Sequence, residues 1–186
     1  LSSGQTWEIA SYGGTNHSPD WNQNRRELLM VLSKDGNSEI YATQRDGQNL
    51  RRLTRTQAVE GSPAWSPDGS KFAYVSNEQG GAKIFVANAD GTGKRRLVAK
   101  GGWNDAPTWS PDGERIAFVS RVDGNNDIFV INSNGDASTI QRLTQGQGNN
   151  ESPTWAPNSR HLAFSSDRTG DWQIFIMLDD GSSQVQ

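Results

Sequence analysis

The chain has 186 residues, the size of one domain with a core of its own. Only 32% of the residues are hydrophobic, but 20 Gly, 7 Pro and 7 Trp indicate a turn-rich fold with large aromatic core residues rather than disorder. The net charge of -3 excludes the basic field that binding to nucleic acid or to an anionic membrane surface requires, and the absence of Cys excludes disulfides and thiolate metal sites.

The chain contains no pattern of a targeting or membrane segment. Residues 1–12 are too polar for a signal peptide, so we expect that an export signal has been removed or never existed. No apolar run approaches the roughly 18 residues of a membrane span, and we therefore expect no membrane insertion.

Four internal repeats follow along the chain. Their landmark is a tryptophan that recurs at spacings of 44, 44 and 46 residues, at Trp21, Trp65, Trp109 and Trp155. An Ile-aromatic pair and an Asp-Gly or Asn-Gly turn recur in the same register, as in Ile84-Phe85 and Asp90-Gly91. The two extra residues of the third spacing fall between Asn134-Gly135 and Leu143, where a hairpin loop can lengthen.

Each repeat predicts four short strands. A first strand with Pro-x-Trp is followed by a tight "SPDG" turn, a second strand such as "KFAYVS", and a third such as "KIFVAN". A fourth strand, near Leu53, Leu97 or Leu143, has the basic neighbours of an outer edge strand. A four-stranded antiparallel meander of about 44 residues predicts an all-β fold, a β-propeller with four blades. We expect a single domain over 1–186, with the blades at 18–54, 62–98, 106–144 and 152–181.

The two ends of the chain are complementary. Ile9 lies 12 residues before Trp21, as each leucine of the fourth strands lies 12 before the next repeat tryptophan, whereas blade 4 lacks its outer strand. Residues 6–10 are therefore expected to be a closing outer strand that pairs with the third strand of blade 4. Two alternatives remain: the chain is a piece of a larger propeller, or two chains complete each other's end blades in an eight-bladed homo-oligomer.

The repeat resembles that of TolB-type propellers. The resemblance covers essentially all of residues 6–181 and rests on Pro-x-Trp-Ser-Pro-Asp-Gly, complete at 65–69 and 109–113, followed by Ala-Phe or Ala-Tyr, Ile-Phe, Asp-Gly and Leu-Thr. It implies a periplasmic or otherwise exported scaffold that binds partner proteins, in TolB's case the peptidoglycan-associated lipoprotein and colicins. Similar blades occur in propellers attached to prolyl oligopeptidase-type peptidases and in enzymes that act on pectin fragments.

Polar residues recur where each first strand begins. In a blade, this end and the loop between the second and third strands open on one face, around the central channel. The positions are Asn16, His17, Glu60, Asn104, Asp105, Asn150 and Glu151. Such a ring has the oxygen ligands for Ca²⁺ or for a polar partner group. The alternative is that these side chains only make local turn hydrogen bonds.

Three of the seven tryptophans, Trp7, Trp103 and Trp172, lie outside the repeat pattern. Trp103 and Trp172 fall on loops of the channel-mouth face, where exposed tryptophans are typical anchors for a partner. The alternative is that each folds down as a lid over its own blade. We expect Trp7 to pack on the outer strand of the closing blade.

No catalytic motif is found. The sequence lacks Gly-x-Ser-x-Gly, His-Glu-x-x-His and a phosphate-binding glycine loop, and its two histidines are His17 and His161. We therefore predict a non-enzymatic scaffold that needs no cofactor and binds a protein, or alternatively a saccharide. A second hypothesis is a hydrolase or lyase with a metal at His17, Asp105 and Glu151. A third is a self-assembling module that forms larger rings or fibres.

Overall fold

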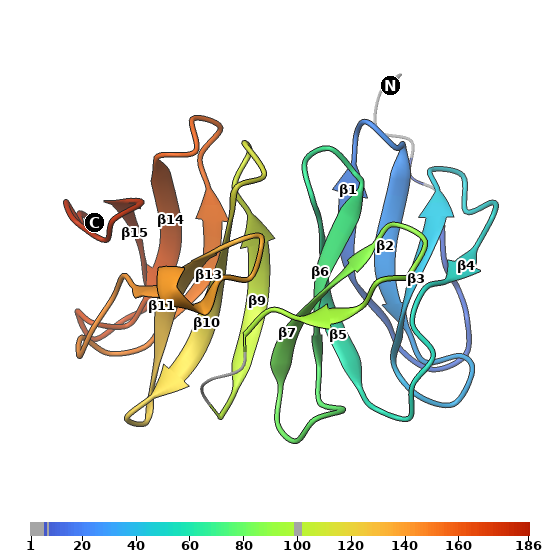
Figure 1. Cartoon of the computed structure of the whole chain (residues 1–186), viewed down its shortest axis with the longest axis horizontal. Helices are drawn as coiled ribbons and strands as arrows, with labels where there is room; N and C mark the ends of the chain where they lie inside the picture. Colours follow the sequence, from blue (N-terminus) through green and yellow to red (C-terminus); the bar gives the residue numbers. More distant parts are fainter. Residues whose placement is uncertain (1–5, 7, 99–101) are drawn as a thin grey trace.

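The computed structural model describes residues 6, 8–98 and 102–186. Its regular structure consists of short β-strands and one 3-10 helix at Ala137–Thr139 (Figure 1). In the described part of the chain, no helix is long and apolar enough to cross a membrane. The all-β prediction is confirmed.

The strands form four antiparallel sheets, each a meander in chain order. Blade 1 contains β1 (Asn16–Asn22), β2 (Glu27–Leu32), β3 (Glu39–Gln44) and β4 (Arg51–Arg52). Blade 2 contains β5 (Glu60–Trp65), β6 (Lys71–Ser76), β7 (Lys83–Asn88) and β8 (Arg95–Arg96). Blade 3 contains β9 (Asn104–Trp109), β10 (Arg115–Val122), β11 (Asn125–Asn132) and β12 (Gln141–Arg142), and blade 4 contains β13 (Asn150–Trp155), β14 (His161–Ser166) and β15 (Gln173–Leu178). The first strands β1, β5, β9 and β13 contact one another in sequence, so the blades are arranged as in a propeller, with these strands innermost.

A local backbone feature recurs in every first strand. The residue before the proline has a positive φ of 45 to 52° in Ser18, Ser62, Ala106 and Ser152, and the strand register shifts there. This shift is a β-bulge, which bends and twists the strand. The "SPDG" turns form as predicted, with Gly69 and Gly113 at positive φ and Ser159 in the same conformation in blade 4.

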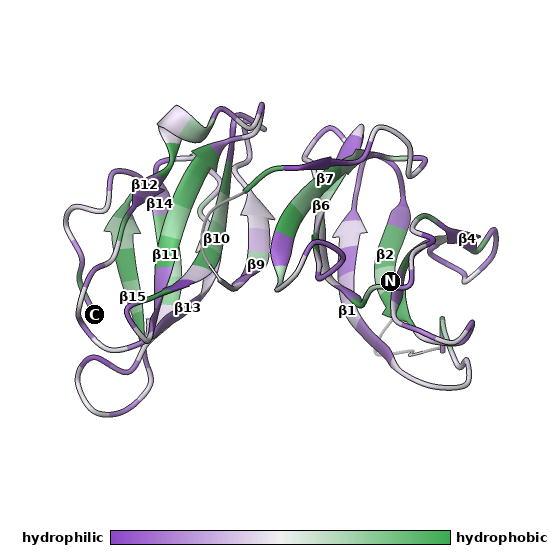
Figure 2. Cartoon of the chain, turned by 60° about the horizontal axis from the view of Figure 1, so that its bottom comes forward, coloured by the Kyte–Doolittle hydropathy of each residue, from purple (hydrophilic) through white to green (hydrophobic). Residues whose placement is uncertain are grey.

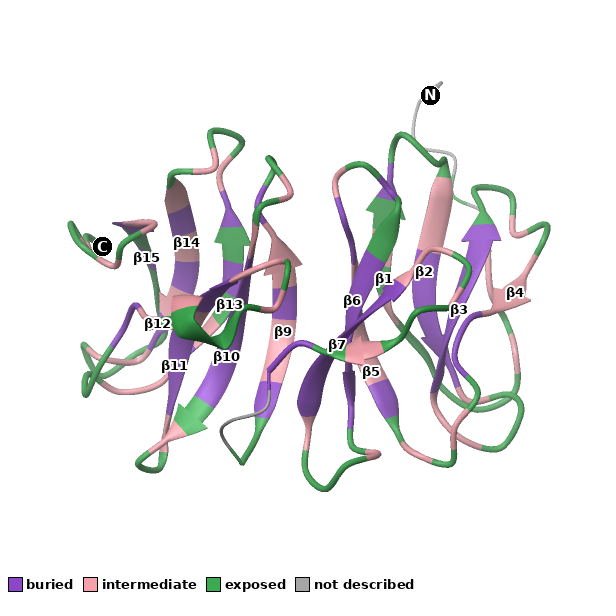
Figure 3. Ribbon diagram, in the orientation of Figure 1, coloured by how far each residue is buried: buried purple, intermediate pink, exposed green. Residues whose placement is uncertain are grey.

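The core lies between consecutive blades rather than within any one of them. We call the side of a blade that faces the preceding blade its leading face, and the other side its trailing face. Between blades 1 and 2, Leu29, Val31 and Ile40 pack against Phe72 and Tyr74. Equivalent apolar clusters join blade 2 to blade 3 and blade 3 to blade 4. Figure 2 shows hydrophobic residues concentrated in strands such as β2, β10, β11 and β15, and Figure 3 shows the buried segments of these sheets.

The predicted closure within one chain is not present. Residues of β15 pair instead with Val185, through two hydrogen bonds between its backbone and that of Ile176. Ile9 and Ala10 pack against blade 1, beside Met30 and the other residues of its leading face. Among the described residues, no strand of blade 4 contacts a strand of blade 1, and these two blades lie at opposite ends of the molecule (Figure 1). The in-chain pairing fails because residues 9–10 lie on blade 1; Trp7 lies outside the described residues.

Candidate functional site

The candidate site is the loop face, which we define as the end of the blades where β1, β5, β9 and β13 begin and where the second strands end. In Figure 1 it is the lower edge, from which β9 runs upward. Trp103 precedes β9 and is 37% exposed, and Trp172 precedes β15 and is 51% exposed. Neither side chain is folded down as a buried lid, since each keeps more than a third of its surface exposed.

Three of the predicted polar residues are buried. Glu60, Asn104 and Asn150 are at most 1% exposed. Asn104 donates through Nδ2 to the Ala82 carbonyl at 3.3 Å, and Asn150 donates to Asp127 Oδ1 at 3.2 Å. These three side chains hold the loops of their own and the preceding blade and are not exposed on the loop face.

The remaining predicted residues are accessible but do not form a metal site. His17 is exposed and its Nδ1 lies 2.9 Å from Ser18 Oγ. Asp105 accepts a hydrogen bond from Ser62 Oγ at 2.6 Å, and Glu151 accepts one from Asn126 Nδ2 at 2.6 Å. In the described ranges, no group of three or more His, Cys, Asp or Glu residues could hold a metal ion. Among these residues, His17, Asp105 and Glu151 are therefore not brought together as one group, and each acid accepts a hydrogen bond from a different neighbour.

One exposed residue of this face was missed. Val59 is 56% exposed and precedes β5, in the register that Trp103 has before β9. Its backbone is fixed by Asn77, whose Oδ1 accepts from the Val59 amide at 2.9 Å. An apolar residue at the same position in two neighbouring blades was the signal in the sequence, but one valine carries little information alone.

Pairs of a buried acid and an arginine stabilise the loops of this face from inside the blades. In blade 1, Glu39 is fully buried and accepts from Arg52 Nη2 at 2.8 Å and from the Thr56 amide at 2.7 Å. In blade 3, Asp127 is fully buried and accepts from Arg142 Nη2 at 2.6 Å. Because a buried carboxylate needs such partners, these pairs fix the loops that follow the fourth strands.

The cavities differ between the two ends of the blades. Near the loop face, a cavity of about 260 Å³ is lined by Asn104, Ser120 and Ile140, among others. This volume is below the roughly 300 to 1,000 Å³ of small-molecule sites. A larger cavity of about 610 Å³ lies at the opposite end, between the turns at Pro67 and Pro111.

Comparisons with known proteins agree with this architecture. The family model described as the TolB beta propeller domain matches residues 1–105 and 62–186. The Tol-Pal system protein TolB of Ruthia magnifica subsp. Calyptogena magnifica is 38% identical over 50 residues, which are 27% of this chain and 12% of that protein. The crystal structure of TolB from Acinetobacter baumannii superimposes with a TM-score of 0.83 and 27% identity, over 99% of this chain and 46% of that one.

A similar propeller fold occurs in an enzyme. Oligogalacturonate lyase in complex with manganese superimposes with a TM-score of 0.72 at 17% identity, over 95% of this chain and 51% of that chain. At this identity the likeness shows the fold alone. The chain spans about half of these two structures and a smaller part of the curated relative. The family model, in contrast, covers the whole chain, which therefore belongs to the TolB-type β-propeller family.

Proposed function

We propose that this chain is a non-enzymatic scaffold that binds a partner protein on its loop face, as an exported or periplasmic TolB-like propeller. The observation that carries the proposal is the exposure of two tryptophans, Trp103 at 37% and Trp172 at 51%, on loops of adjacent blades at the same end. Exposed tryptophan is costly to leave in water and is enriched among the residues that dominate binding energy.

The composition of the loop face favours a protein over a small ligand. Besides the two tryptophans, Asp105, Glu151 and His17 add hydrogen-bonding groups to this face, and Val59 adds apolar surface. Protein interfaces have such a mixture of aromatic anchors and polar rim and need no deep pocket.

The family membership supports the same class of function. The curated relative is named a Tol-Pal system protein, which describes a protein that acts together with others. The partner that the resemblance implies is the peptidoglycan-associated lipoprotein, and this protein is the probe for the test.

The test is calorimetric titration of the purified lipoprotein into the chain and into two variants, Trp103→Ala and Trp172→Ala. Loss of a tryptophan anchor costs on the order of 2 kcal/mol or more, so each variant should bind roughly 30-fold more weakly. The matched control is Trp21→Ala, because Trp21 is 40% exposed but lies at the opposite end of its strand.

Binding by the native chain with unchanged affinity in both loop-face variants would contradict the proposed face. No binding by the native chain would contradict this partner and, with it, the proposed function as stated. Unfolding curves of each variant confirm that the side chain and not the fold has been lost.

A further inference from the structure

One face of blade 4 is apolar and uncovered. Along β15, Ile174 is 63% and Ile176 is 47% exposed, whereas Phe175 and Met177 between and after them are buried. Side chains alternate across a strand, so one face of this blade packs on blade 3 and the other faces solvent. Val185, which pairs with Ile176, adds a third apolar side chain at 59% exposure.

The same positions are interface positions in the other three blades. Ile174 corresponds to Ile40, Ile84 and Ile128, all fully buried, and Ile176 corresponds to Ala42, Val86 and Val130, at most 2% exposed. Each of those residues packs against the leading face of the following blade. The trailing face of blade 4 is therefore built as a fourth copy of an interface that the chain already forms three times.

The leading face of blade 1 shows the other half of that interface. The Ile9 carbonyl lies beside Gly47, just as the Leu53 carbonyl lies beside Gly91 and the Leu143 carbonyl beside Gly181. Residues 9–10 thus occupy the place of an outer strand from a preceding blade. In the described residues, the sheet to which such a strand would belong is absent.

Trp21 also lacks the partner that two of its three equivalents have; in the described residues, the buried indole nitrogen of the third, Trp65, has no hydrogen-bond partner either. The indole of Trp109 donates to the Ala64 carbonyl at 3.1 Å, and that of Trp155 donates to the Thr108 carbonyl at 3.3 Å, both in the preceding blade. Trp21 is 40% exposed and donates to Gln23 within its own blade. Blade 1 therefore presents to a preceding blade both an outer strand, residues 9–10, and a hydrogen-bond donor, the indole of Trp21.

The two ends fit together in register. Val185 pairs with Ile176 as Arg95 pairs with Val86. Two residues after Arg95, the Leu97 amide donates to the Ile84 carbonyl at 2.8 Å. Ile9 has the corresponding leucine position, which lies two residues beyond the one that Val185 holds on Ile176. Residues 9–10 would therefore continue the strand that Val185 begins on a neighbouring molecule, with the Ile9 amide facing the Ile174 carbonyl.

We propose that the trailing face of blade 4 docks on the leading face of blade 1 of a second copy of this chain. In this interface Ile174 and Ile176 are covered, the Ile9 amide donates to the Ile174 carbonyl, and the Trp21 indole donates to the Thr154 carbonyl. Ser165 replaces the valine that stands at this position in blades 1 to 3, so the contact is less apolar than its intrachain counterparts and the assembly is reversible. The proposal is independent of the loop face, which remains open in the assembly.

The first test is light scattering of the whole chain over a wide range of concentration. The expected result is a mass of two chains, or of more if the head-to-tail contacts do not close into a ring. Ile174→Glu should return the protein to the mass of one chain, because it places a charge in the covered face. The matched control is Val59→Glu, an equally exposed apolar residue on the loop face, which should assemble as the native chain does.

A monomeric native chain at every concentration would overturn the proposal, and so would an Ile174→Glu variant that still assembles. The orientation is tested by mixing Trp21→Cys with Thr154→Cys and adding a short bismaleimide, which is selective because the chain has no Cys of its own. Cross-linked pairs are expected from this mixture but not from Trp21→Cys mixed with Val59→Cys. Equal yields from the two mixtures would refute the proposed orientation.

Discussion

Blades 2 and 4 have the same strand pattern but different surroundings. On the trailing face of blade 2, Ile84 is fully buried against blade 3, whereas Ile174, at the same position of blade 4, is 63% exposed. The repeat thus places apolar residues on both faces of a blade, and the neighbouring blade decides which of them stabilise the fold. Stability in such a molecule is a property of the boundaries between blades more than of any single blade.

The largest effect is expected from the same substitution at the two equivalent positions, Ile84 and Ile174. Ile84→Ala should lower the free energy of unfolding by about 2 to 5 kcal/mol, because it leaves a cavity between blades 2 and 3. Ile174→Ala should change it by no more than about 0.5 kcal/mol in the monomer, since the side chain is already in water. Urea unfolding of both variants at low protein concentration measures the difference. Similar losses in the two variants would mean that the exposed face of blade 4 is covered even in the monomer.

The repeat explains why the fold was predictable from the sequence. Trp65, Trp109 and the "SPDG" turns specify strand, turn and register locally, and related residues recur in the same register along the chain. The sheet that residues 9–10 join was not predictable in the same way. The outer-strand pattern around Ile9 is the same whether it pairs with its own blade 4 or with another sheet. A strand pattern defines the pairing position but not the partner.

The candidate site was predicted only in part. The exposure of Trp103 and Trp172 agrees with the loop positions assigned from the sequence. The burial of Glu60, Asn104 and Asn150 was not evident, because it results from the neighbouring loops that fold over these residues. Polar residues at a strand start serve loop hydrogen bonds and ligand contacts with the same chemistry, and only their tertiary surroundings distinguish the two.

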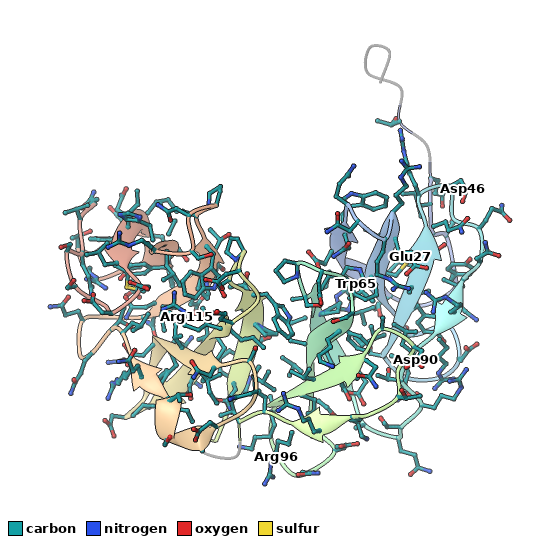
Figure 4. All side chains as sticks on the ribbon, turned by 45° about the horizontal axis from the view of Figure 1, so that its top comes forward. Glu27, Asp46, Trp65, Asp90, Arg96 and Arg115 are labelled. Atoms are coloured by element: carbon teal, nitrogen blue, oxygen red, sulfur yellow. The ribbon has the colours of Figure 1, made fainter. Side chains whose placement is uncertain are left out.

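A smaller effect is expected at the clamp between blades 3 and 4. Arg115 donates to Asp179 Oδ2 at 2.7 Å and to the Ser159 carbonyl at 2.8 Å, and its guanidinium lies 4.9 Å from the ring centre of Trp155. Figure 4 labels Arg115 in this half of the molecule and Trp65 in the half formed by blades 1 and 2. His161 has in blade 4 the strand position that Arg115 has in blade 3, but in the described residues no further blade follows it.

Arg115→Ala should therefore lower the free energy of unfolding by about 1 to 2 kcal/mol, with the stacking on Trp155 contributing most because the ion pair is partly exposed. His161→Ala should change it by less than about 0.5 kcal/mol, because the histidine holds no following blade. Thermal and urea unfolding of the two variants provide the comparison. An equal loss at His161 would show that the clamp acts within a blade and not between blades.

The smallest effect concerns Glu60, which is an acid at a register position where blades 3 and 4 have Asn104 and Asn150. Burial raises the pKa of Glu60, and hydrogen bonds from Thr56 and Ser76 offset this only in part. The folded chain therefore binds this proton more tightly than the unfolded chain, and the free energy of unfolding falls as the pH rises from the ordinary glutamate range through the raised pKa. Above that window the ionised carboxylate costs stability.

Glu60→Gln removes this cost and keeps an oxygen that accepts from the Thr56 hydroxyl, which lies 2.6 Å from Oε1 in the native chain. The variant should be more stable than the native chain at neutral pH, and the gain should vanish below the ordinary pKa of glutamate, where the native side chain is protonated as well. Urea unfolding of both proteins at the two pH values measures this difference and cancels the titration of every other group. A gain of the same size at both pH values would mean that packing, not charge, distinguishes Glu60 from the asparagines of the later blades.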